Sequence, residues 1–264
     1  MINMHQLVGK HDILLITLDT LRFDVAQQEL AAGRLPNLNQ YIDQWQQRHA
    51  PGSFTYASHH AIFAGFFPTP IDNPAAPRLF ALSFPGSETT GKNTYVFDAP
   101  NIIAGLESVG YHTVCIGGVG FFNKQTPLGN QFPHMFIESY WDSGTGVTDP
   151  NSTKNQVDLI LRLLKRQLEQ PLFLFLNISA LHQPNCFYLE GCQQDNLKSH
   201  AAALRYVDNE LGRLFSQWRN RPAFVILCSD HGTAYGEQGY QGHRLAHEVV
   251  WTVPYAEFTI GEAY

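Results

Sequence analysis

Acidic and imidazole side chains gather where several predicted strands end. Asp19 follows the apolar run DILLITL, and the pair Asp230 and His231 follows AFVILCS. His182 lies four residues beyond a further run, LFLFLNI. Ligands of open α/β sheets bind beyond the carboxyl ends of the strands, so these side chains are expected at one edge. Carboxylate oxygens combined with imidazole nitrogens suit Zn²⁺ or Mn²⁺, and suit Ca²⁺ or Mg²⁺ less well.

Each of these residues also has an ordinary structural interpretation. An Asp that follows a strand often caps a helix or completes a turn. For Asp19 or His182 taken alone, the structural interpretation is the simpler one. Asp230 and His231 are adjacent on one turn, and together with Asp19 they favour a metal site.

A candidate nucleophile, Thr55, stands directly before a predicted helix, in the segment SFTYASHH. The backbone N–H groups and the dipole at the start of a helix favour a negative, phosphate-like group. A hydroxyl at that place, deprotonated with the help of a metal, becomes a usable nucleophile. The competing interpretation is that Thr55 and Ser58 only cap the helix, and the local sequence alone favours this second interpretation.

The strands that must position these residues alternate with helical patterns, which predicts an α/β domain. Nearly continuous apolar runs are typical of parallel strands whose two faces are covered by helices. We therefore predict one three-layer α/β/α sandwich over residues 1–264, with a largely parallel central sheet. The predicted strands are 12–18, 79–84, 113–116, 172–178 and 223–228. The predicted helices are 21–32, 36–47, 58–66, 101–108, 157–168 and 197–218.

The composition narrows the classes of function. The 264 residues carry 17 Lys and Arg against 23 Asp and Glu, a net charge of −6 without a basic block. This balance argues against nucleic acid or an anionic membrane as the main ligand. The first residues, MINMHQLVGKHD, do not form a signal-peptide pattern, and the apolar runs are far below the ~20 residues of a membrane helix. We expect a soluble, cytoplasmic protein whose four cysteines are free thiols.

Several segments resemble the alkaline phosphatase superfamily, particularly its sulfatase-like and phosphoryl-transferase branches. ITLDTLRFD at 16–24 resembles the family opening DTLRAD, and TYASHHAIFAG at 55–65 has the spacing of the nucleophile segment T-x-P-S-H-A-S-L-x-T-G. SDHG at 229–232 is similar to the metal motif and is followed by a Gly-His pair at 242–243. Further similarities are LPNL at 35–38, against TPNL, and VDNELG at 207–212, against VDDELG. The resemblance runs from residue 12 to about 260 and implies an alkaline phosphatase-like fold.

The resemblance implies a two-step phosphoryl transfer. The implied metal ligands are Asp19, Asp230 and His231. Thr55 would attack phosphorus in line, and a covalent phosphothreonine would then pass to water or to another acceptor. Two-zinc relatives carry an Asp four residues before their His, whereas Ile178 precedes His182 here, so one ion is expected and a second site is incomplete. This set is similar to the single-metal site of phosphoglycerol and phosphoethanolamine transferases, which are membrane-anchored.

The resemblance also implies the remaining site residues. His182 and His243 would hold non-bridging oxygens, protonate the leaving group or bind a second metal. Ser58 and His59 would bind the substrate, which is expected to be a small phosphate mono- or diester. Sulfatases carry C-x-P-S-R and oxidise its first residue to formylglycine, whereas this chain has Thr55, an alanine in place of Pro, and His59 in place of Arg.

Three alternatives to a metal-dependent phosphoric ester hydrolase or transferase remain open. The first is a sulfatase-like sulfuric ester hydrolase that works without formylglycine. The second is a non-catalytic metal-binding scaffold, because the chain is short for the family. The third is a nucleotide-binding protein, since GSETTGKN at 86–93 almost spells G-x-x-x-x-G-K-[ST]. The final Ser or Thr of that pattern is Asn93, and a poor helix start follows it.

Overall fold

The computed structural model describes residues 2–65, 101–166, 168–218 and 221–261, and also residues 80–81, 85 and 95–96. The strands of its central sheet are β1 (Asp12–Leu18), β2 (Gln46–His49), β5 (His112–Ile116), β6 (Glu138–Tyr140), β7 (Leu172–Ile178), β8 (Ala223–Cys228) and β11 (Thr252–Ile260). They lie in the order β2-β11-β8-β1-β7-β5-β6. The pairs β1–β7, β1–β8, β5–β7 and β5–β6 are parallel, and β11 runs antiparallel to both β8 and β2.

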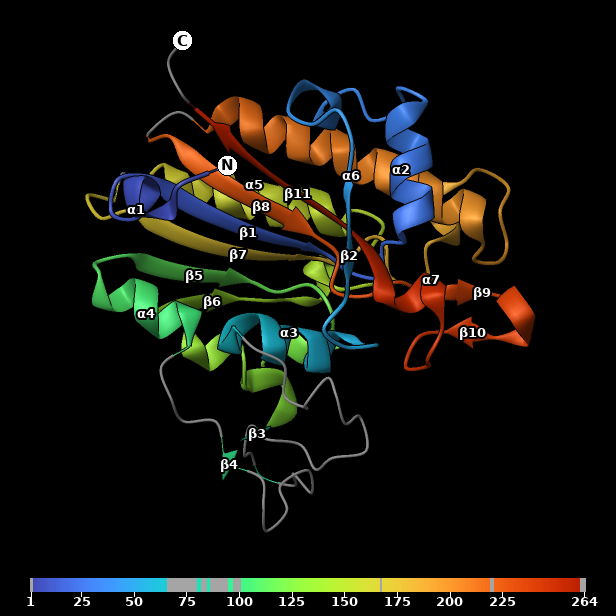
Figure 1. Ribbon diagram of the computed structural model, residues 1–264, viewed down its shortest axis with the longest axis horizontal. Helices are drawn as coiled ribbons and strands as arrows, with labels where there is room; N and C mark the ends of the chain where they lie inside the picture. The colour runs from blue at the N-terminus through green and yellow to red at the C-terminus, as the bar shows by residue number, and fades with distance from the viewer. Residues whose placement is uncertain are drawn as a thin grey trace.

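The remaining elements cover this sheet or extend from it. The helices are α1 (Met4–Leu7), α2 (Phe23–Ala31), α3 (Thr55–Ala64), α4 (Ile102–Ser108), α5 (Ser152–Leu164), α6 (Leu197–Gln217) and α7 (Glu248–Trp251). Two short two-stranded ribbons pair β3 (Phe80–Ala81) with β4 (Tyr95–Val96) and β9 (Ala234–Tyr235) with β10 (Gln241–Gly242). Helices α2, α5 and α6 cover one face of the sheet, and α3 and α4 cover the other (Figure 1).

The alternation of side chains along β1 shows why both faces are covered. Leu14 and Ile16 belong to the apolar core shared with α2, α5 and α6, whereas Ile13 and Leu15 belong to the core shared with α3 and α4. All residues of β1 and β7 are buried, as expected for strands between two helical layers. The predicted α/β/α sandwich with a largely parallel sheet is confirmed, while its extent as one domain over residues 1–264 stays a prediction.

The predicted helix at 36–47 is wrong. Only a short 3₁₀ helix forms, at Leu38–Gln40, and residues 46–49 are the edge strand β2. The cause lies far away in the sequence, on α6. Asp208 accepts hydrogen bonds from the backbone N–H groups of Asn37 (3.2 Å) and Leu38 (2.8 Å), which fixes a turn there. Strand β2 then pairs with β11, which supplies partners that a local pattern cannot reveal.

Other differences concern the boundaries and the last strand. Helix α3 begins at Thr55 rather than residue 58, and α5 begins at Ser152 rather than residue 157. The sequence patterns predict no strand beyond residue 228, yet β11 forms there. Its buried residues alternate with half-buried ones along most of its length. Such alternation is typical of an antiparallel strand near a sheet edge. The loop 86–93 of the nucleotide-binding alternative lies outside the described residues.

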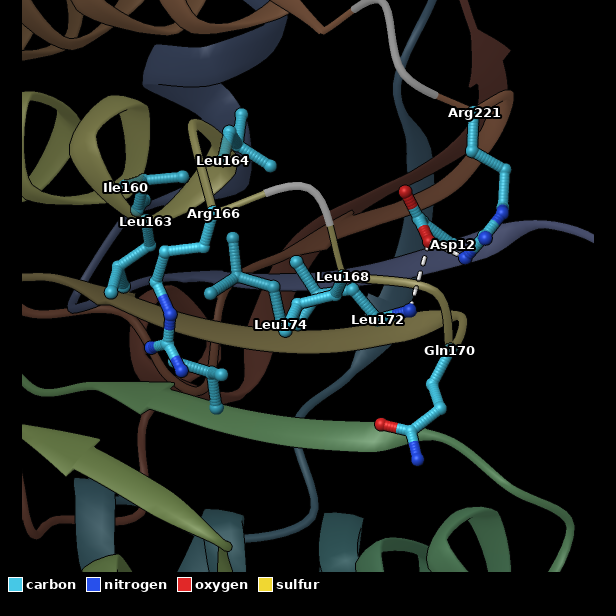
Figure 2. A pocket seen from close by; sticks show the side chains of 11 residues that line it. Asp12, Ile160, Leu163, Leu164, Arg166, Leu168, Gln170, Leu172, Leu174 and Arg221 are labelled. Atoms are coloured by element: carbon cyan, nitrogen blue, oxygen red, sulfur yellow. Dashed lines mark hydrogen bonds and ion pairs between the residues drawn. The ribbon is translucent and has the colours of Figure 1, made fainter.

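The amino ends of the strands are held together by Asp12. Its Oδ1 accepts hydrogen bonds from the Leu172 N–H (2.8 Å) and from the Arg221 guanidinium (3.2 Å) (Figure 2). A cavity of about 280 Å³ lies beside this contact, between α5 and the sheet, and aliphatic side chains such as Leu163 and Leu174 line it. None of the helices that the structure describes is long and apolar enough to cross a bilayer.

Candidate active site

The carboxyl ends of β1 and β8 bring together the three predicted metal ligands. Asp19, Asp230 and His231 are completely buried, and one possible ligand atom from each lies within 4.8 Å of the others. The His231 Nε2 atom lies 3.5 Å from Asp230 Oδ2 and 4.0 Å from Asp19 Oδ1. Because β1 and β8 are adjacent parallel strands in register, their ends meet at the same point of the sheet edge.

A strained turn after β1 supports this arrangement. Thr20 has a φ of +66°, in the left-handed region that a β-branched residue rarely adopts. In this conformation its N–H donates to Asp230 Oδ1 (3.3 Å), and its hydroxyl donates to the Leu181 carbonyl oxygen (3.1 Å). Backbone strain of this kind concentrates at functional sites, where the surrounding contacts hold it in place.

The donor set fits a divalent cation. Asp19 Oδ1 and Asp230 Oδ2 are buried and have no hydrogen-bond partner among the described residues. His231 Nδ1 faces the Gly232 carbonyl oxygen at 2.9 Å and must donate to it, so the lone pair of Nε2 faces the two carboxylates. Two ionised carboxylates buried without a counter-charge are costly. A cation between these three atoms would satisfy all of them, and an O,O,N set suits Zn²⁺ or Mn²⁺.

The pKa values of the cluster reflect the same lack of a positive counter-charge. Burial raises the pKa of Asp230 to about 7. Burial, and then the nearby charge of Asp230, raise the pKa of Asp19 to about 6. Burial also lowers the pKa of His231, which keeps its imidazole neutral and able to act as a ligand. In the absence of a cation, Asp230 is therefore about half protonated at pH 7, whereas Asp19 takes up its proton mainly below about pH 6.

Thr55 is the first residue of α3, and its hydroxyl faces the cluster. Its Oγ1 lies 3.3 Å from Asp19 Oδ2 and 3.3 Å from His231 Nε2. Capping does not account for this position, because Phe54 is the N-cap residue and no side chain caps the helix. The Ser58 hydroxyl donates to the Asp230 carbonyl oxygen at 2.7 Å and so ties α3 to the end of β8.

His59 lies beneath Thr55, away from any open surface. It is completely buried, with Nδ1 2.8 Å from the Thr55 carbonyl oxygen and Nε2 3.0 Å from Thr17 Oγ1. Burial lowers the pKa of His59 to about 3, so a neutral imidazole occupies the place where the family resemblance expects an Arg. The structure thus buries His59 and Ser58 beneath the candidate nucleophile Thr55, whereas the family resemblance implies that they contact the substrate.

A cavity of about 310 Å³ opens beside Thr55. Its lining residues are Thr55, Val119, Gly120, Phe121, Thr126, Leu128, Gly129, Val147, His182, His243 and Arg244. The rings of His182 and His243 are 5.5 Å apart, and the rings of His231 and His243 are 4.7 Å apart. The structure therefore brings both additional histidines to the same cavity as the candidate nucleophile, Thr55.

The two cavity histidines differ in their surroundings. His182 Nδ1 must donate to the Gln183 carbonyl oxygen at 2.6 Å, which leaves Nε2 for another partner. Burial and the neighbouring histidines lower the pKa of His243 to about 3, so its imidazole is neutral at ordinary pH. His243 Nδ1 is buried and has no partner among the described residues.

Sequence reasoning missed two residues of this region. Arg244 also lines the cavity, and its guanidinium carbon lies 5.0 Å from the centre of the Phe54 ring. Asn177 on β7 is completely buried, and its Nδ2 donates to Asp19 Oδ2 at 3.4 Å. Two signals in the sequence point to them: Arg244 directly follows His243, and Asn177 is the one polar residue of the run LFLFLNI.

Comparisons with known proteins agree with this architecture. The chain matches the C-terminal periplasmic domain of phosphoethanolamine transferase EptC from Campylobacter jejuni with a TM-score of 0.65 and 14% identity, over 95% of this chain and 80% of that one. It matches the soluble domain of lipooligosaccharide phosphoethanolamine transferase A from Neisseria meningitidis with a TM-score of 0.64 and 14% identity, over 96% and 77%. No curated protein sequence matches the chain.

A further similar structure was solved as a zinc complex. It is the periplasmic domain of EptC from Escherichia coli, with a TM-score of 0.65 and 12% identity, over 96% of this chain and 73% of that one. Fold and site together define a member of the alkaline phosphatase superfamily. Within it, residues 11–255 match the Sulfatase family, and the chain belongs to that family. Membership of the Sulfatase family supports the general kind of activity, which is transfer of a phosphoryl or sulfuryl group.

Proposed function

We propose that this chain is a metal-dependent enzyme that hydrolyses or transfers phosphate mono- or diesters through a covalent phosphothreonine at Thr55. The observation that carries the proposal is the position of the Thr55 hydroxyl. It lies 3.3 Å from both Asp19 Oδ2 and His231 Nε2, at the open side of a cluster with two unpartnered, buried carboxylate oxygens. A structural threonine at a helix start would not need such surroundings.

One divalent metal, Zn²⁺ or Mn²⁺, would be held by Asp19, Asp230 and His231. When bound, it supplies positive charge that lowers the pKa of a nearby hydroxyl and stabilises the charge that develops on the phosphoryl oxygens. A single ion is supported because, among the described residues, these three form the one group of possible ligands whose atoms all lie within 4.8 Å of one another. Among the described residues, no carboxylate joins His182 and His243 in a second cluster of this kind.

The remaining steps belong to side chains of the chain itself. Thr55 Oγ1 gives its proton to Asp19 Oδ2, 3.3 Å away, and attacks phosphorus. The bond to the leaving oxygen breaks, and that oxygen takes a proton from His182 Nε2. In the second step a water oxygen attacks phosphorus and the Thr55–phosphorus bond breaks, Thr55 Oγ1 takes its proton back from Asp19, and His182 Nε2 takes the proton of the water. This assignment is supported by the contact of His182 Nδ1 with the Gln183 carbonyl oxygen, which leaves Nε2 to exchange protons. His243 is the weaker candidate for proton transfer because its pKa is lowered to about 3.

The cavity favours a particular kind of small ester. Among the described residues that line the cavity, only Arg244 carries a permanent charge, and a guanidinium can bind a non-bridging oxygen of phosphate. Phe121, Leu128 and Val147 provide an apolar wall on which an aryl or alkyl leaving group can pack. A small phosphate ester with an apolar substituent is therefore the proposed substrate.

The proposal is tested with metal-stripped protein to which Zn²⁺, Mn²⁺, Mg²⁺ or Ca²⁺ is returned in separate assays. Turnover of an aryl phosphate, an aryl phosphodiester and an aryl sulfate is measured for wild type, Thr55→Ala and Thr55→Ser. We expect metal-dependent turnover of a phosphate ester that is lost in Thr55→Ala and partly kept in Thr55→Ser, with the exposed Thr148→Ala as control. Full turnover by Thr55→Ala would refute the nucleophile.

Sulfuryl transfer is the second candidate, because residues 11–255 match the Sulfatase family. Turnover of the aryl sulfate with no turnover of either phosphate ester would replace the proposed reaction with this one. Metal binding without turnover of any ester would favour the non-catalytic scaffold. Both outcomes come from the same set of assays.

We also propose that the protein works in a reducing compartment such as the cytoplasm. Cys115, Cys186, Cys192 and Cys228 are all free thiols, and exposed or half-buried thiols persist where glutathione keeps them reduced. Cell fractionation followed by alkylation of the thiols tests this. Recovery of the protein in a periplasmic or secreted fraction would contradict it.

A further inference from the structure

A line of buried polar side chains runs beneath the candidate active site. Asn177 on β7, Thr17 on β1 and His59 on α3 are all completely buried. The His59 ring packs edge-on against Phe122 (5.2 Å) and Phe175 (5.4 Å), inside an aromatic cluster. A polar atom in such a place must find a partner within the protein, because an unmade hydrogen bond there is costly. The partners of these three side chains are therefore informative.

The orientation of the Asn177 amide is fixed by its neighbours. Its Oδ1 accepts a hydrogen bond from the Val119 N–H at 3.0 Å. Its Nδ2 donates to Thr17 Oγ1 at 3.1 Å and to Asp19 Oδ2 at 3.4 Å. A flipped amide would place an oxygen against the Asp19 carboxylate and an N–H against the Val119 N–H, so the opposite orientation loses the bonds to both of these partners.

The orientation of Asn177 determines the direction of the next two bonds. Thr17 Oγ1 accepts from Asn177, so its own proton is available for His59 Nε2, 3.0 Å away. His59 Nδ1 faces the Thr55 carbonyl oxygen at 2.8 Å, and that oxygen can only accept. The proton of a neutral His59 must therefore sit on Nδ1, and Nε2 must accept from Thr17.

We propose that Asn177, Thr17 and His59 form a one-directional hydrogen-bond relay that positions the nucleophile Thr55 relative to the metal ligand Asp19. One end of the relay holds Asp19 Oδ2, and the other end holds the backbone of Thr55, the residue whose hydroxyl contacts the same Oδ2. His59 is thus a positioning residue rather than a substrate contact. The inference rests on the proposed function in one respect, the role of Thr55 as nucleophile.

The backbone near Gly118 is shaped to permit the relay. A Cβ atom on Gly118 would lie 2.3 Å from the Asn177 carbonyl oxygen and 3.0 Å from Asn177 Oδ1. Only a residue without a side chain lets the chain approach closely enough for the neighbouring Val119 N–H to reach Asn177 Oδ1. The segment that follows β5 therefore fixes the orientation of Asn177, and β1 and α3 contribute the other two members of the relay.

The direct test is the protonation of the His59 ring, which requires neither metal nor turnover. Long-range ¹H–¹⁵N spectra of ¹⁵N-histidine-labelled protein should show one neutral, Nδ1-protonated imidazole, assigned by its absence in His59→Gln. In Thr17→Val, which removes the donor but keeps the shape, this signal should shift. A His59 that is protonated on Nε2, or on both nitrogens, would overturn the proposed direction, as would an unchanged signal in Thr17→Val. If His59→Gln does not fold, the shift in Thr17→Val supplies the assignment.

Kinetics tests the positioning role. With the ester that wild type turns over, Thr17→Val should lower kcat about tenfold with little change in KM, the effect of one lost hydrogen bond. Thr17→Ser keeps the hydroxyl and should restore kcat. Thr113→Val is the matched control, because Thr113 is a buried threonine on β5 that bonds Glu107 instead.

Failure of this inference can be told apart from failure of the proposed function. Wild-type kcat in Thr17→Val, or an equal fall in Thr113→Val, would refute the positioning role even though the enzyme is active. If wild type turns over no ester, the proposed function fails, and the spectra of His59 still decide whether the relay exists.

Discussion

Removal of one buried charge should make the metal-free protein more stable, although it destroys a metal ligand. The change is Asp230→Asn. Asp230 Oδ1 accepts from the N–H groups of Thr20 and His231, and an Asn side-chain oxygen can keep both bonds. The new NH₂ group would take the place of the unpartnered Oδ2, within reach of His231 Nε2 at 3.5 Å. The variant therefore loses a buried negative charge, and one N–H of the new group can donate to His231 Nε2.

The magnitude follows from the pKa of Asp230, which burial raises from 3.8 to about 7. Folding raises the pKa of this carboxyl group, so protonation of Asp230 stabilises the native state. This contribution is complete below pH 3.8, the pKa in the unfolded chain, and is lost as the pH rises through about 7, the pKa in the native state. Three pKa units correspond to about 4 kcal/mol at pH 8. For a chain of this size the Asp230→Asn variant should melt about 10 °C above metal-free wild type at pH 8, and about 4 °C above it at pH 5.

The assay is thermal unfolding after exhaustive chelation, at pH 5 and pH 8, with and without added Zn²⁺. Zn²⁺ should raise the melting temperature of wild type at pH 8 and have a much smaller effect on Asp230→Asn. Asp208→Asn is the control with the opposite sign, because the Asp208 carboxylate accepts hydrogen bonds from the Asn37 and Leu38 backbone N–H groups. A metal-free Asp230→Asn that is less stable than wild type at pH 8 would refute the reasoning.

Three further outcomes are expected. Gly118→Ala should lower the free energy of unfolding by about 2 kcal/mol in urea titrations, because the new Cβ meets the Asn177 carbonyl oxygen at 2.3 Å. Arg244→Gln should reduce kcat/KM for an anionic ester about tenfold while leaving the melting temperature of the protein unchanged, since the side chain is exposed. Arg166 lowers the pKa of Glu138 from 4.5 to about 2, so the stability that separates wild type from Glu138→Gln should shrink as the pH falls from 5 to 2 in urea titrations.

Strand positions and strand-end residues could be read from the sequence because their signals are local. β1, β7 and β8 are continuous apolar runs, and the residues that follow them are polar, so Asp19 and Asp230 could be placed at one sheet edge. The elements that were mispredicted depend on distant partners. Residues 36–47 look helical until Asp208 on α6 captures the backbone at Asn37, and β11 becomes a strand by pairing with β8.

Within the candidate site, too, the sequence predicts what depends on local signals and misses what depends on distant partners. The family resemblance predicts Thr55 as the nucleophile, which stays a prediction, and it predicts that His59, where sulfatases carry Arg, contacts the substrate. The position of α3 on the sheet decides otherwise: it carries the His59 ring into contact with Phe122 and Phe175, and only buried partners remain within reach. The sequence alone assigns no role to Asn177, because one polar residue in an apolar strand forms no periodic pattern. Its meaning comes from Asp19 on the adjacent strand.

The central claim is that the Thr55 hydroxyl becomes phosphorylated during turnover. Its most direct test is an acid quench of metal-loaded wild type under saturating phosphate ester, followed by peptide mapping with mass spectrometry. The account predicts one phosphoryl group on Thr55, present only when metal and substrate are both supplied. Turnover of the ester with an unmodified Thr55, or with the phosphoryl group on another residue, would contradict it.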